Sequence, residues 1–129
     1  MFTLEHRYYG ESKPTLFMNT TNMKYLSSRQ ALQDLAMFMA NMTERFNITR
    51  PRPWVSFGCS YAGSLSAWLK LKFPHLMSGA VSESGPLVAK LDFFKHFQVL
   101  KDALKSHSYA CLYEFGNNSD LGLRRYVSK

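Results

Sequence analysis

The stretch Trp54–Leu71 constrains this chain most, because a strand pattern, a tight turn and a helix pattern follow one another there without a break. A short apolar run ends at Phe57, and small residues surround Ser60 immediately afterwards. Apolar residues then recur at helical spacing until Pro74 ends the pattern. The sequence therefore predicts a strand that turns sharply into a helix, which is the setting in which a serine becomes a nucleophile.

The turn has the pattern G-x-S-x-A, formed by Gly58, Ser60 and Ala62. A strained corner brings backbone segments so close together that a Cβ at position 58 would block it, and position 62 must be small for the same reason. The corner would expose the Ser60 hydroxyl and direct the Tyr61 backbone N–H, at the positive end of the helix, toward a developing oxyanion. With its flanking strand and helix, the motif fits a nucleophile elbow as well as it fits an ordinary glycine turn.

The two cysteines, Cys59 and Cys111, indicate neither a disulfide framework nor a zinc site. Cys59 lies beside Ser60 on a turn that we expect to be buried, so a disulfide to Cys111 would have to reach the elbow. Cys59 could itself be read as a nucleophile, but the geometry of an elbow favours Ser60. We expect no metal and no cofactor.

Helix and strand patterns alternate along the chain, which predicts an α/β fold with a parallel sheet and right-handed crossovers. Residues 2–4 have the pattern of a strand end, and a polar, aromatic loop follows at residues 5–12. Ser27 and Gln30 form a capping box for an amphipathic helix that runs to about Arg45.

Weaker patterns cover the remaining segments. Residues 15–26 look like an irregular connection, and residues 47–53 form a loop before the strand at Trp54. A short strand is expected at residues 78–82 and an amphipathic helix from about Asp92. From His107 onward the pattern fades, and residues 109–129 give no clear element.

Three ionisable residues invite a catalytic interpretation, and each has a simpler one. We interpret His6 as a hydrogen-bonded structural residue. His75 is close to Ser60 in sequence and across a helix from it, so it is a poor general base. Glu83 follows a strand, at the end where α/β sites gather, but an exposed loop glutamate is the simpler interpretation.

Composition excludes several classes of protein. The chain of 129 residues suffices for one domain but is short for a complete α/β-hydrolase sheet. Its net charge of +7 comes from scattered Lys and Arg without a nucleic-acid-binding module, so we expect no nucleic-acid partner. No apolar run reaches ~18 residues, so no membrane span is expected. The first residues do not form a signal peptide, but four glycosylation sequons favour a secretory-pathway origin; they begin at Asn19, Asn41, Asn47 and Asn117.

Five segments together resemble one family, in their order and at their intervals. The chain is similar to the lysosomal serine exopeptidases that include prolylcarboxypeptidase and dipeptidyl peptidase II, and most similar to the thymus-specific serine protease branch. The resemblance covers roughly residues 2–95, and five ordered segments are far more specific than one elbow. The segments are Glu5–Gly10, Leu26–Leu32, Gly58–Gly63, Trp68–His75 and Leu91–Phe93.

The resemblance implies an α/β-hydrolase fragment, with residues 1–90 as a partial core and residues 91–129 as the start of a helical cap followed by a divergent tail. It implies a Ser–Asp–His triad whose serine is Ser60, with the Tyr61 N–H as one oxyanion donor. Family members cleave short peptides near a terminus, as dipeptidyl-peptidases or Pro-X carboxypeptidases, in the lysosome or endosome or after secretion. The residues expected to line the substrate site are Glu5, His6, Tyr8 and Tyr9.

Departures from the family pattern limit what these residues can do alone. Cys59 replaces the usual glycine before the serine, and Glu83 interrupts a run of small residues. The family's Asp and His are expected beyond Lys129, the loop with the second oxyanion donor is expected before Met1, and beyond about residue 95 the pattern cannot be followed. We therefore expect the isolated fragment to be inactive.

Three other functions remain open. One is an esterase on the same fold, although the ordered segments disfavour it. Another is a non-catalytic binding or regulatory fragment that associates with a full-length homologue. The third is a basic nucleic-acid binder, which no motif supports.

Overall fold

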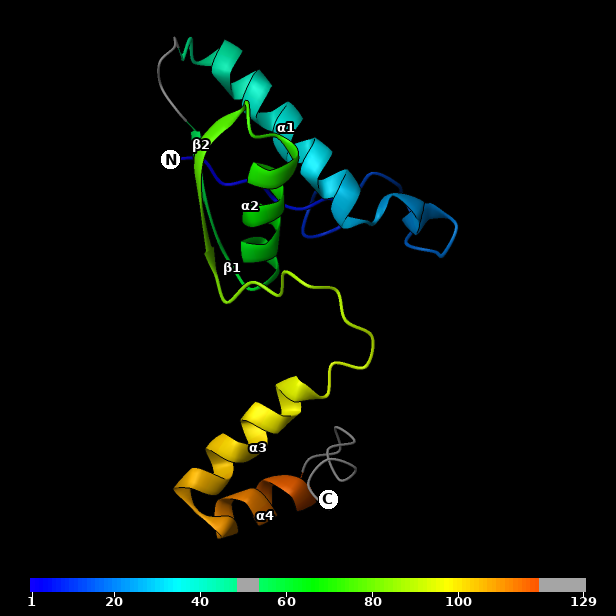
Figure 1. Cartoon of the computed structure of the whole chain (residues 1–129). Helices are drawn as coiled ribbons and strands as arrows, with labels where there is room; N and C mark the ends of the chain where they lie inside the picture. Colours follow the sequence, from blue (N-terminus) through cyan, green and yellow to red (C-terminus); the bar gives the residue numbers. More distant parts are fainter. Residues whose placement is uncertain (49–53, 119–129) are drawn as a thin grey trace. The chain divides into compact units, whose positions relative to one another are not determined.

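The computed structural model describes residues 1–48 and 54–118 (Figure 1). The chain forms two compact units, Met1–Val88 and Ala89–Lys129. The first unit contains the predicted elbow.

The first unit is built on two parallel strands joined through a helix (Figure 1). Strand β1 (Trp54–Cys59) pairs with β2 (Met77–Glu83), and α2 (Tyr61–Lys72) connects them. The register pairs Val55 with Gly79 and Cys59 with Glu83. The predicted parallel pairing is thus confirmed, and β2 extends one residue beyond the predicted strand at each end.

Helix α1 (Ser28–Arg45) begins and ends where the sequence predicted. Ser27 is its N-cap, and the Ser27 side-chain oxygen accepts the Gln30 backbone N–H at 3.2 Å. This bond confirms half of the predicted capping box. Before α1, the expected irregular connection contains one short 3₁₀ helix, η1 (Asn22–Tyr25).

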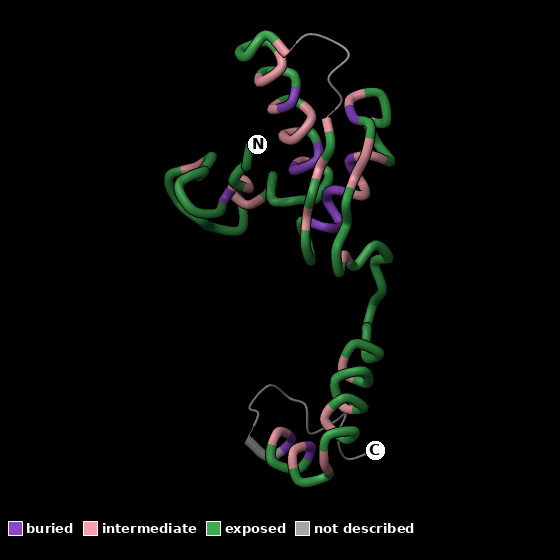
Figure 2. The backbone as a smooth tube through the Cα atoms, turned by 90° about the vertical axis from the view of Figure 1, so that its left-hand side faces the viewer, coloured by how far each residue is buried: buried purple, intermediate pink, exposed green. Residues whose placement is uncertain are grey.

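The core of the first unit lies between the two α-helices and one face of the sheet. Figure 2 shows the buried residues mainly along α1 and α2. Burial alternates along β1, so the opposite face leaves the apolar side chains of Val55, Phe57 and Val81 exposed. The buried core residues are Ala31, Leu32, Met39, Leu65, Leu69 and Met77.

The prediction of a strand end at residues 2–4 was wrong: these residues form neither a strand nor a helix. The ring of Phe2 instead packs against aromatic rings of α1 and β1, with centroids 6.0 Å from Phe38 and 5.5 Å from Trp54. Aromatic packing, rather than a hydrogen-bonded ladder, therefore holds this segment.

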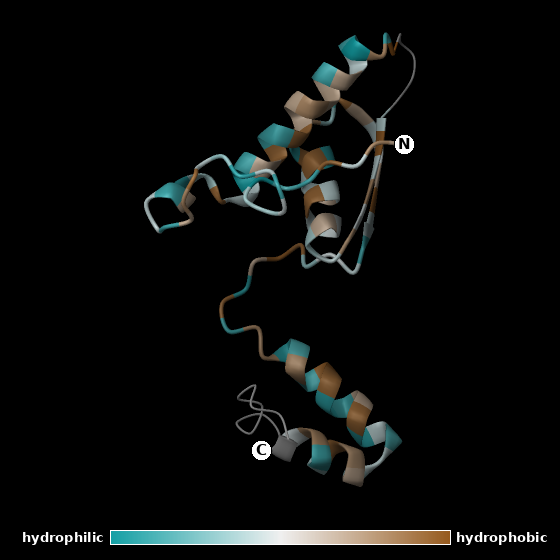
Figure 3. Cartoon of the chain, turned by 180° about the vertical axis from the view of Figure 1, so that it is seen from behind, coloured by the Kyte–Doolittle hydropathy of each residue, from teal (hydrophilic) through white to brown (hydrophobic). Residues whose placement is uncertain are grey.

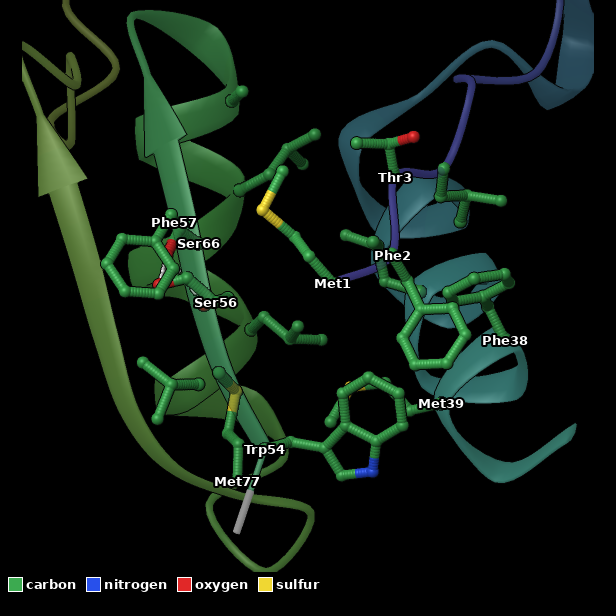
Figure 4. Close-up of a pocket in the computed structure, with 16 residues that line it drawn as sticks. Met1, Phe2, Thr3, Phe38, Met39, Trp54, Ser56, Phe57, Ser66 and Met77 are labelled. Atoms are coloured by element: carbon green, nitrogen blue, oxygen red, sulfur yellow. Dashed lines mark hydrogen bonds between the residues drawn. The ribbon is translucent and has the colours of Figure 1, made fainter. Parts of the chain in front are cut away.

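An apolar pocket of about 720 Å³ lies between residues 1–4 and the edge of β1 (Figure 4). Helices α1 and α2 complete its walls. Ser60 and His6 do not line it, but Ala62 of the elbow motif does.

The second unit contains two helices where the sequence predicted one. Helix α3 (Lys95–His107) starts later than predicted, because Asp92 has a left-handed backbone with φ of 48° that a helix cannot contain. Helix α4 (Tyr109–Asn118) was not predicted. The Ser108 hydroxyl accepts the Cys111 N–H at 3.0 Å, and Leu112 is buried. Figure 3 shows apolar and polar residues alternating around α3.

In residues 1–48 and 54–118, no helix has both the length and the apolar character that crossing a bilayer requires. The predicted loop at residues 47–53 lies mostly outside the described residues.

Candidate active site

Ser60 occupies a sharp corner between β1 and α2, as the sequence predicted. Its backbone has φ of 54° and ψ of −126°, a conformation that costs energy for a residue with a Cβ. The residue is exposed. The strand, corner and helix of a nucleophile elbow are therefore all present.

Close backbone approach explains the glycines on either side of Ser60. A Cβ on Gly58 would overlap the backbone carbonyl of Ala62. A Cβ on Gly63 would lie 2.7 Å from the Glu83 carbonyl oxygen, closer than carbon and oxygen tolerate. The corner therefore requires glycine at position 58, for the reason that the sequence indicated.

Backbone hydrogen bonds hold the corner against β2 and α2. The Ser60 N–H donates to the Glu83 carbonyl at 2.9 Å, and the Ser64 N–H donates to the Ser60 carbonyl at 3.0 Å. The next N–H, that of Tyr61, is the first of α2, and the first N–H groups of a helix have no acceptor within it. This N–H lies at the positive end of the helix dipole, where an anion is stabilised.

The neighbouring serines are engaged in the interior, unlike Ser60. Ser64 is fully buried, and its hydroxyl donates to the Pro86 carbonyl at 3.0 Å. Ser66 is also buried, and its hydroxyl lies 2.6 Å from that of Ser56. Among these four serines, Ser60 is the one whose residue is exposed.

Cys59 is exposed, so the expectation of a buried turn at this residue was wrong. It lies at an outward-facing position of β1, where burial alternates residue by residue. Both Cys59 and Cys111 are free thiols.

Of the four residues expected to line the site, His6 and Tyr9 lie near the elbow. The Nε2 atom of His6 lies 3.3 Å from the Tyr61 hydroxyl, and the two ring centroids are 5.7 Å apart. The Tyr9 ring packs edge-on against His6, with centroids 4.9 Å apart. Burial, with a smaller contribution from Tyr9, raises the pKa of the Tyr61 hydroxyl.

Tyr8 and Glu5 form hydrogen bonds to nearby backbone groups of the N-terminal segment. The Tyr8 side chain is only 5% exposed, and its hydroxyl donates to the Asn22 carbonyl at 2.6 Å. One Glu5 carboxylate oxygen accepts the backbone N–H groups of Glu11 and Ser12 at 3.1 and 2.9 Å. Hydrogen bonds from Ser12 lower the pKa of Glu5. The hydrogen bonds of these two residues stabilise the shape of the loop.

An ion pair that the sequence did not reveal joins this loop to α1. The Arg7 guanidinium donates from Nε and Nη2 to the two carboxylate oxygens of Asp34, both at 2.5 Å. Gln30 donates a further bond to Asp34 at 3.3 Å. The hydrogen bonds from Arg7 lower the pKa of Asp34. No local pattern marks this pair, because 27 residues separate its members.

His75 lies across α2 from Ser60, as predicted, and Glu83 is exposed as predicted but is the last residue of β2 rather than part of a loop. His75 is exposed beyond the C-terminal end of α2, and a helix of 12 residues is about 18 Å long, so Ser60 lies far from it. The Glu83 side chain is exposed, and its backbone carbonyl contacts the elbow. In the part of the chain that the structure describes, no three His, Cys, Asp or Glu side chains gather as metal ligands.

Three of the four sequon asparagines, Asn19, Asn41 and Asn47, are exposed. The side chain of Asn117 lies outside the described residues.

Comparison with known proteins supports the resemblance seen in the sequence. Residues 1–119 match the family Serine carboxypeptidase S28. The match continues well past residue 95, so the expectation that the family pattern could not be followed beyond that point was wrong.

Several curated proteins are similar to this chain. A putative serine protease of Caenorhabditis elegans is 43% identical over 111 residues, covering 86% of this chain and 22% of that protein. The thymus-specific serine protease of Homo sapiens is 43% identical over 106 residues, covering 82% of this chain and 21% of that protein. The lysosomal Pro-X carboxypeptidase of Mus musculus is 37% identical over 86 residues, covering 64% of this chain and 18% of that protein. The chain thus spans about a fifth of the length of these relatives.

Proposed function

Because this chain belongs to the serine carboxypeptidase S28 family, we propose that it carries the nucleophile of a serine exopeptidase, and that this nucleophile is Ser60. The corner at Ser60 carries the proposal, because an exposed serine at a positive φ joins a strand directly to a helix there. Such strain is retained where the geometry serves a function. The proposed substrates are short peptides, cleaved near one terminus.

In the proposed reaction, the Ser60 oxygen forms a bond to the carbonyl carbon of the scissile peptide. Its proton passes to a histidine base contributed by another part of the whole protein. The Tyr61 N–H donates to the oxyanion of the tetrahedral intermediate. The carbon–nitrogen bond then breaks, the amine leaves with a proton, and water hydrolyses the acyl-enzyme.

The proposed scaffold is an α/β-hydrolase core, of which the unit β1–α2–β2 is the part that bears the elbow. The parallel pairing of β1 with β2 and the helix between them are compatible with that scaffold. On this proposal, residues 1–90 belong to the core and residues 91–129 begin a helical cap.

Within the family, we propose a dipeptidyl-peptidase or Pro-X carboxypeptidase type of cleavage in a lysosomal or secreted protein. A relative named lysosomal Pro-X carboxypeptidase supports this choice. The exposed sequon asparagines Asn19, Asn41 and Asn47 are compatible with passage through the secretory pathway.

We also propose that these 129 residues alone turn over peptides very slowly. Loss of a triad member costs on the order of 10⁴ to 10⁶ in turnover in serine proteases. A serine without a base is an ordinary alcohol at neutral pH, although an oxyanion donor beside it still favours reaction at that site.

A fluorophosphonate probe, with mass spectrometry to locate the label, tests both parts of the proposal. Ser84 is a matched internal control, because it too is exposed and has a positive φ of 49° at the end of β2. We expect Ser60 to be labelled in preference to Ser84, at a rate at least ~10⁴-fold below that of a complete S28 peptidase measured alongside. Equal labelling of the two serines would contradict the role of Ser60. Labelling as fast as in the complete enzyme would contradict the inactivity.

A further inference from the structure

The loop of residues 5–12 holds its shape more firmly than an ordinary surface loop. Tyr8 has a φ of 72°, which is strained for a bulky residue, yet its ring is buried and its hydroxyl is bonded to Asn22. Its N–H also donates to the Ser12 carbonyl at 2.7 Å. The Glu5 carboxylate closes the loop by accepting backbone N–H groups from its far side. Strain that is held by so many bonds is typical of a functional segment.

This loop is also anchored to the body of the first unit. The two-pronged bond from Arg7 to Asp34 fixes the backbone next to His6 against α1. The Arg7 and Asp34 side chains are 22% and 29% exposed, so water only partly surrounds the pair. The position of His6 is therefore fixed relative to helix α1.

The hydrogen bonds of His6 determine which ring nitrogen carries the proton. Its Nδ1 lies 2.7 Å from the Arg7 carbonyl oxygen, which can only accept, so Nδ1 must be the donor. In the neutral ring Nε2 is then the acceptor, and the Tyr61 hydroxyl, 3.3 Å away, donates to it. The anchored loop thus presents a hydrogen-bond acceptor to the residue that follows Ser60.

We propose that His6 is a positioning residue for acyl transfer: by accepting the Tyr61 hydroxyl it fixes the orientation of the residue whose backbone N–H binds the oxyanion. This inference rests on the proposed function of Ser60 and Tyr61. Tyr61 is the first residue of α2 and is 40% exposed, so burial alone does not hold its side chain in place. His6 contacts the Tyr61 ring and hydroxyl from a segment about fifty residues earlier in the sequence, and the Tyr9 ring packs against His6 in turn.

Two substitutions at position 6 separate the two ring nitrogens. His6→Asn places an amide near the position of Nδ1, so it keeps the bond to Arg7 and loses the acceptor for Tyr61. His6→Gln reaches the position of Nε2 and keeps that acceptor. His75→Ala is the matched control, because it removes an exposed histidine beyond the opposite end of the same helix.

The first readout is nuclear magnetic resonance of the labelled chain, following the Tyr61 ring and its backbone amide. Both substitutions at position 6 remove the imidazole ring, so the Tyr61 ring resonance should shift in both. We expect the Tyr61 backbone amide resonance to shift in His6→Asn, to stay nearer its original position in His6→Gln, and not to shift in His75→Ala. The second readout is the rate of fluorophosphonate labelling at Ser60. We expect this rate to fall about tenfold in His6→Asn, less than the 10² to 10³ that follows loss of an oxyanion donor, and to recover in His6→Gln.

The two readouts distinguish failure of this inference from failure of the proposed function. Tyr61 resonances that do not move in His6→Asn would overturn the contact, whatever the labelling shows. Selective labelling of Ser60 at an unchanged rate in His6→Asn would overturn the positioning role while leaving the proposed function intact. Absence of selective labelling in the unsubstituted chain would overturn the proposed function, and the positioning role with it.

Discussion

The corner at Ser60 and the loop at residues 5–12 both contain a non-glycine residue at a positive φ, but they hold it by different means. At the corner, Gly58 and Gly63 allow backbone segments to approach so closely that Ser60 has little freedom to relax. In the loop, Tyr8 is held by hydrogen bonds and burial, with an ion pair beside it. One strained residue thus depends on the absence of side chains, and the other depends on their presence.

The sharpest way to break the corner is Gly58→Ala. The added Cβ would overlap the Ala62 carbonyl, which belongs to the backbone and cannot rotate away. We expect the free energy of unfolding to fall by about 3 kcal/mol or more. Urea denaturation followed by tryptophan fluorescence measures this change, and both tryptophans, Trp54 and Trp68, report on the first unit.

The matched control for this substitution is Gly79→Ala. Its Cβ would meet only the methyl groups of Val55, at the ordinary distances of 3.7 and 3.9 Å. We expect a change within about 0.5 kcal/mol of zero. Equal destabilisation by the two substitutions would show that close approach is not what requires glycine at position 58.

Removing the Tyr8 hydroxyl oxygen should lower the free energy of unfolding, because the loop loses a hydrogen bond. Tyr8→Phe removes the hydroxyl that donates to Asn22 and keeps the buried ring, so we expect a loss of about 1 kcal/mol. Tyr9→Phe is the control, because Tyr9 is 55% exposed, and it should change stability by less than about 0.5 kcal/mol. If Tyr8→Phe proved as neutral as its control, burial alone would account for the strained backbone of Tyr8.

The same difference explains what could be predicted from the sequence. The determinants of the corner lie within Gly58–Gly63, so a short motif and its flanking patterns revealed the strand, the turn and the helix. The contact between His6 and Tyr61 spans 55 residues, and the bond between Arg7 and Asp34 spans 27. Such contacts depend on how elements pack together, and a pattern along the chain does not contain that information.

Of the errors in the prediction, the one at residues 2–4 has the same origin, and the other two are local. Residues 2–4 have strand-forming side chains, but the packing of Phe2 on neighbouring rings decides their conformation. Cys59 was expected to be buried because the turn is tight, yet its place in the strand alternation faces outward. Helix α4 was missed because its signals are modest, namely a serine at its start and the spacing of Leu112 and Phe115.

The ion pair between Arg7 and Asp34 should contribute less than the buried Tyr8 hydroxyl. Both side chains are partly exposed, so solvent screens the charges, and we expect a coupling free energy of about 0.5 to 1 kcal/mol. A double-mutant cycle with Arg7→Lys and Asp34→Asn measures it, and the lysine tests whether the two-pronged geometry matters beyond charge. A coupling near zero would mean that the pair orients the loop without stabilising it.

The smallest expected effect is on the pH dependence of stability, and it comes from the ion pair that joins the loop to α1. The hydrogen bonds from Arg7 lower the pKa of Asp34 in the folded state below its ordinary value of 3.8. The unfolded chain therefore binds the proton more readily, so the stabilisation is complete above that ordinary value and is lost as the pH falls through the folded-state value. We expect urea midpoints measured from about pH 6 down to about pH 3 to fall less steeply in Asp34→Asn than in the unsubstituted chain.

Glu5 complicates this measurement, because hydrogen bonds from Ser12 lower its pKa as well and give a dependence of the same sign. Glu5→Gln therefore serves as the control, and the double variant should show the flattest profile. Ser60 and its glycines carry no titrating side chain in this range, so the acid sensitivity of the first unit should follow the loop and not the corner. A profile unchanged by both substitutions would show that the two carboxylates titrate alike in the folded and unfolded chain, and that the geometry of the loop survives without their charge.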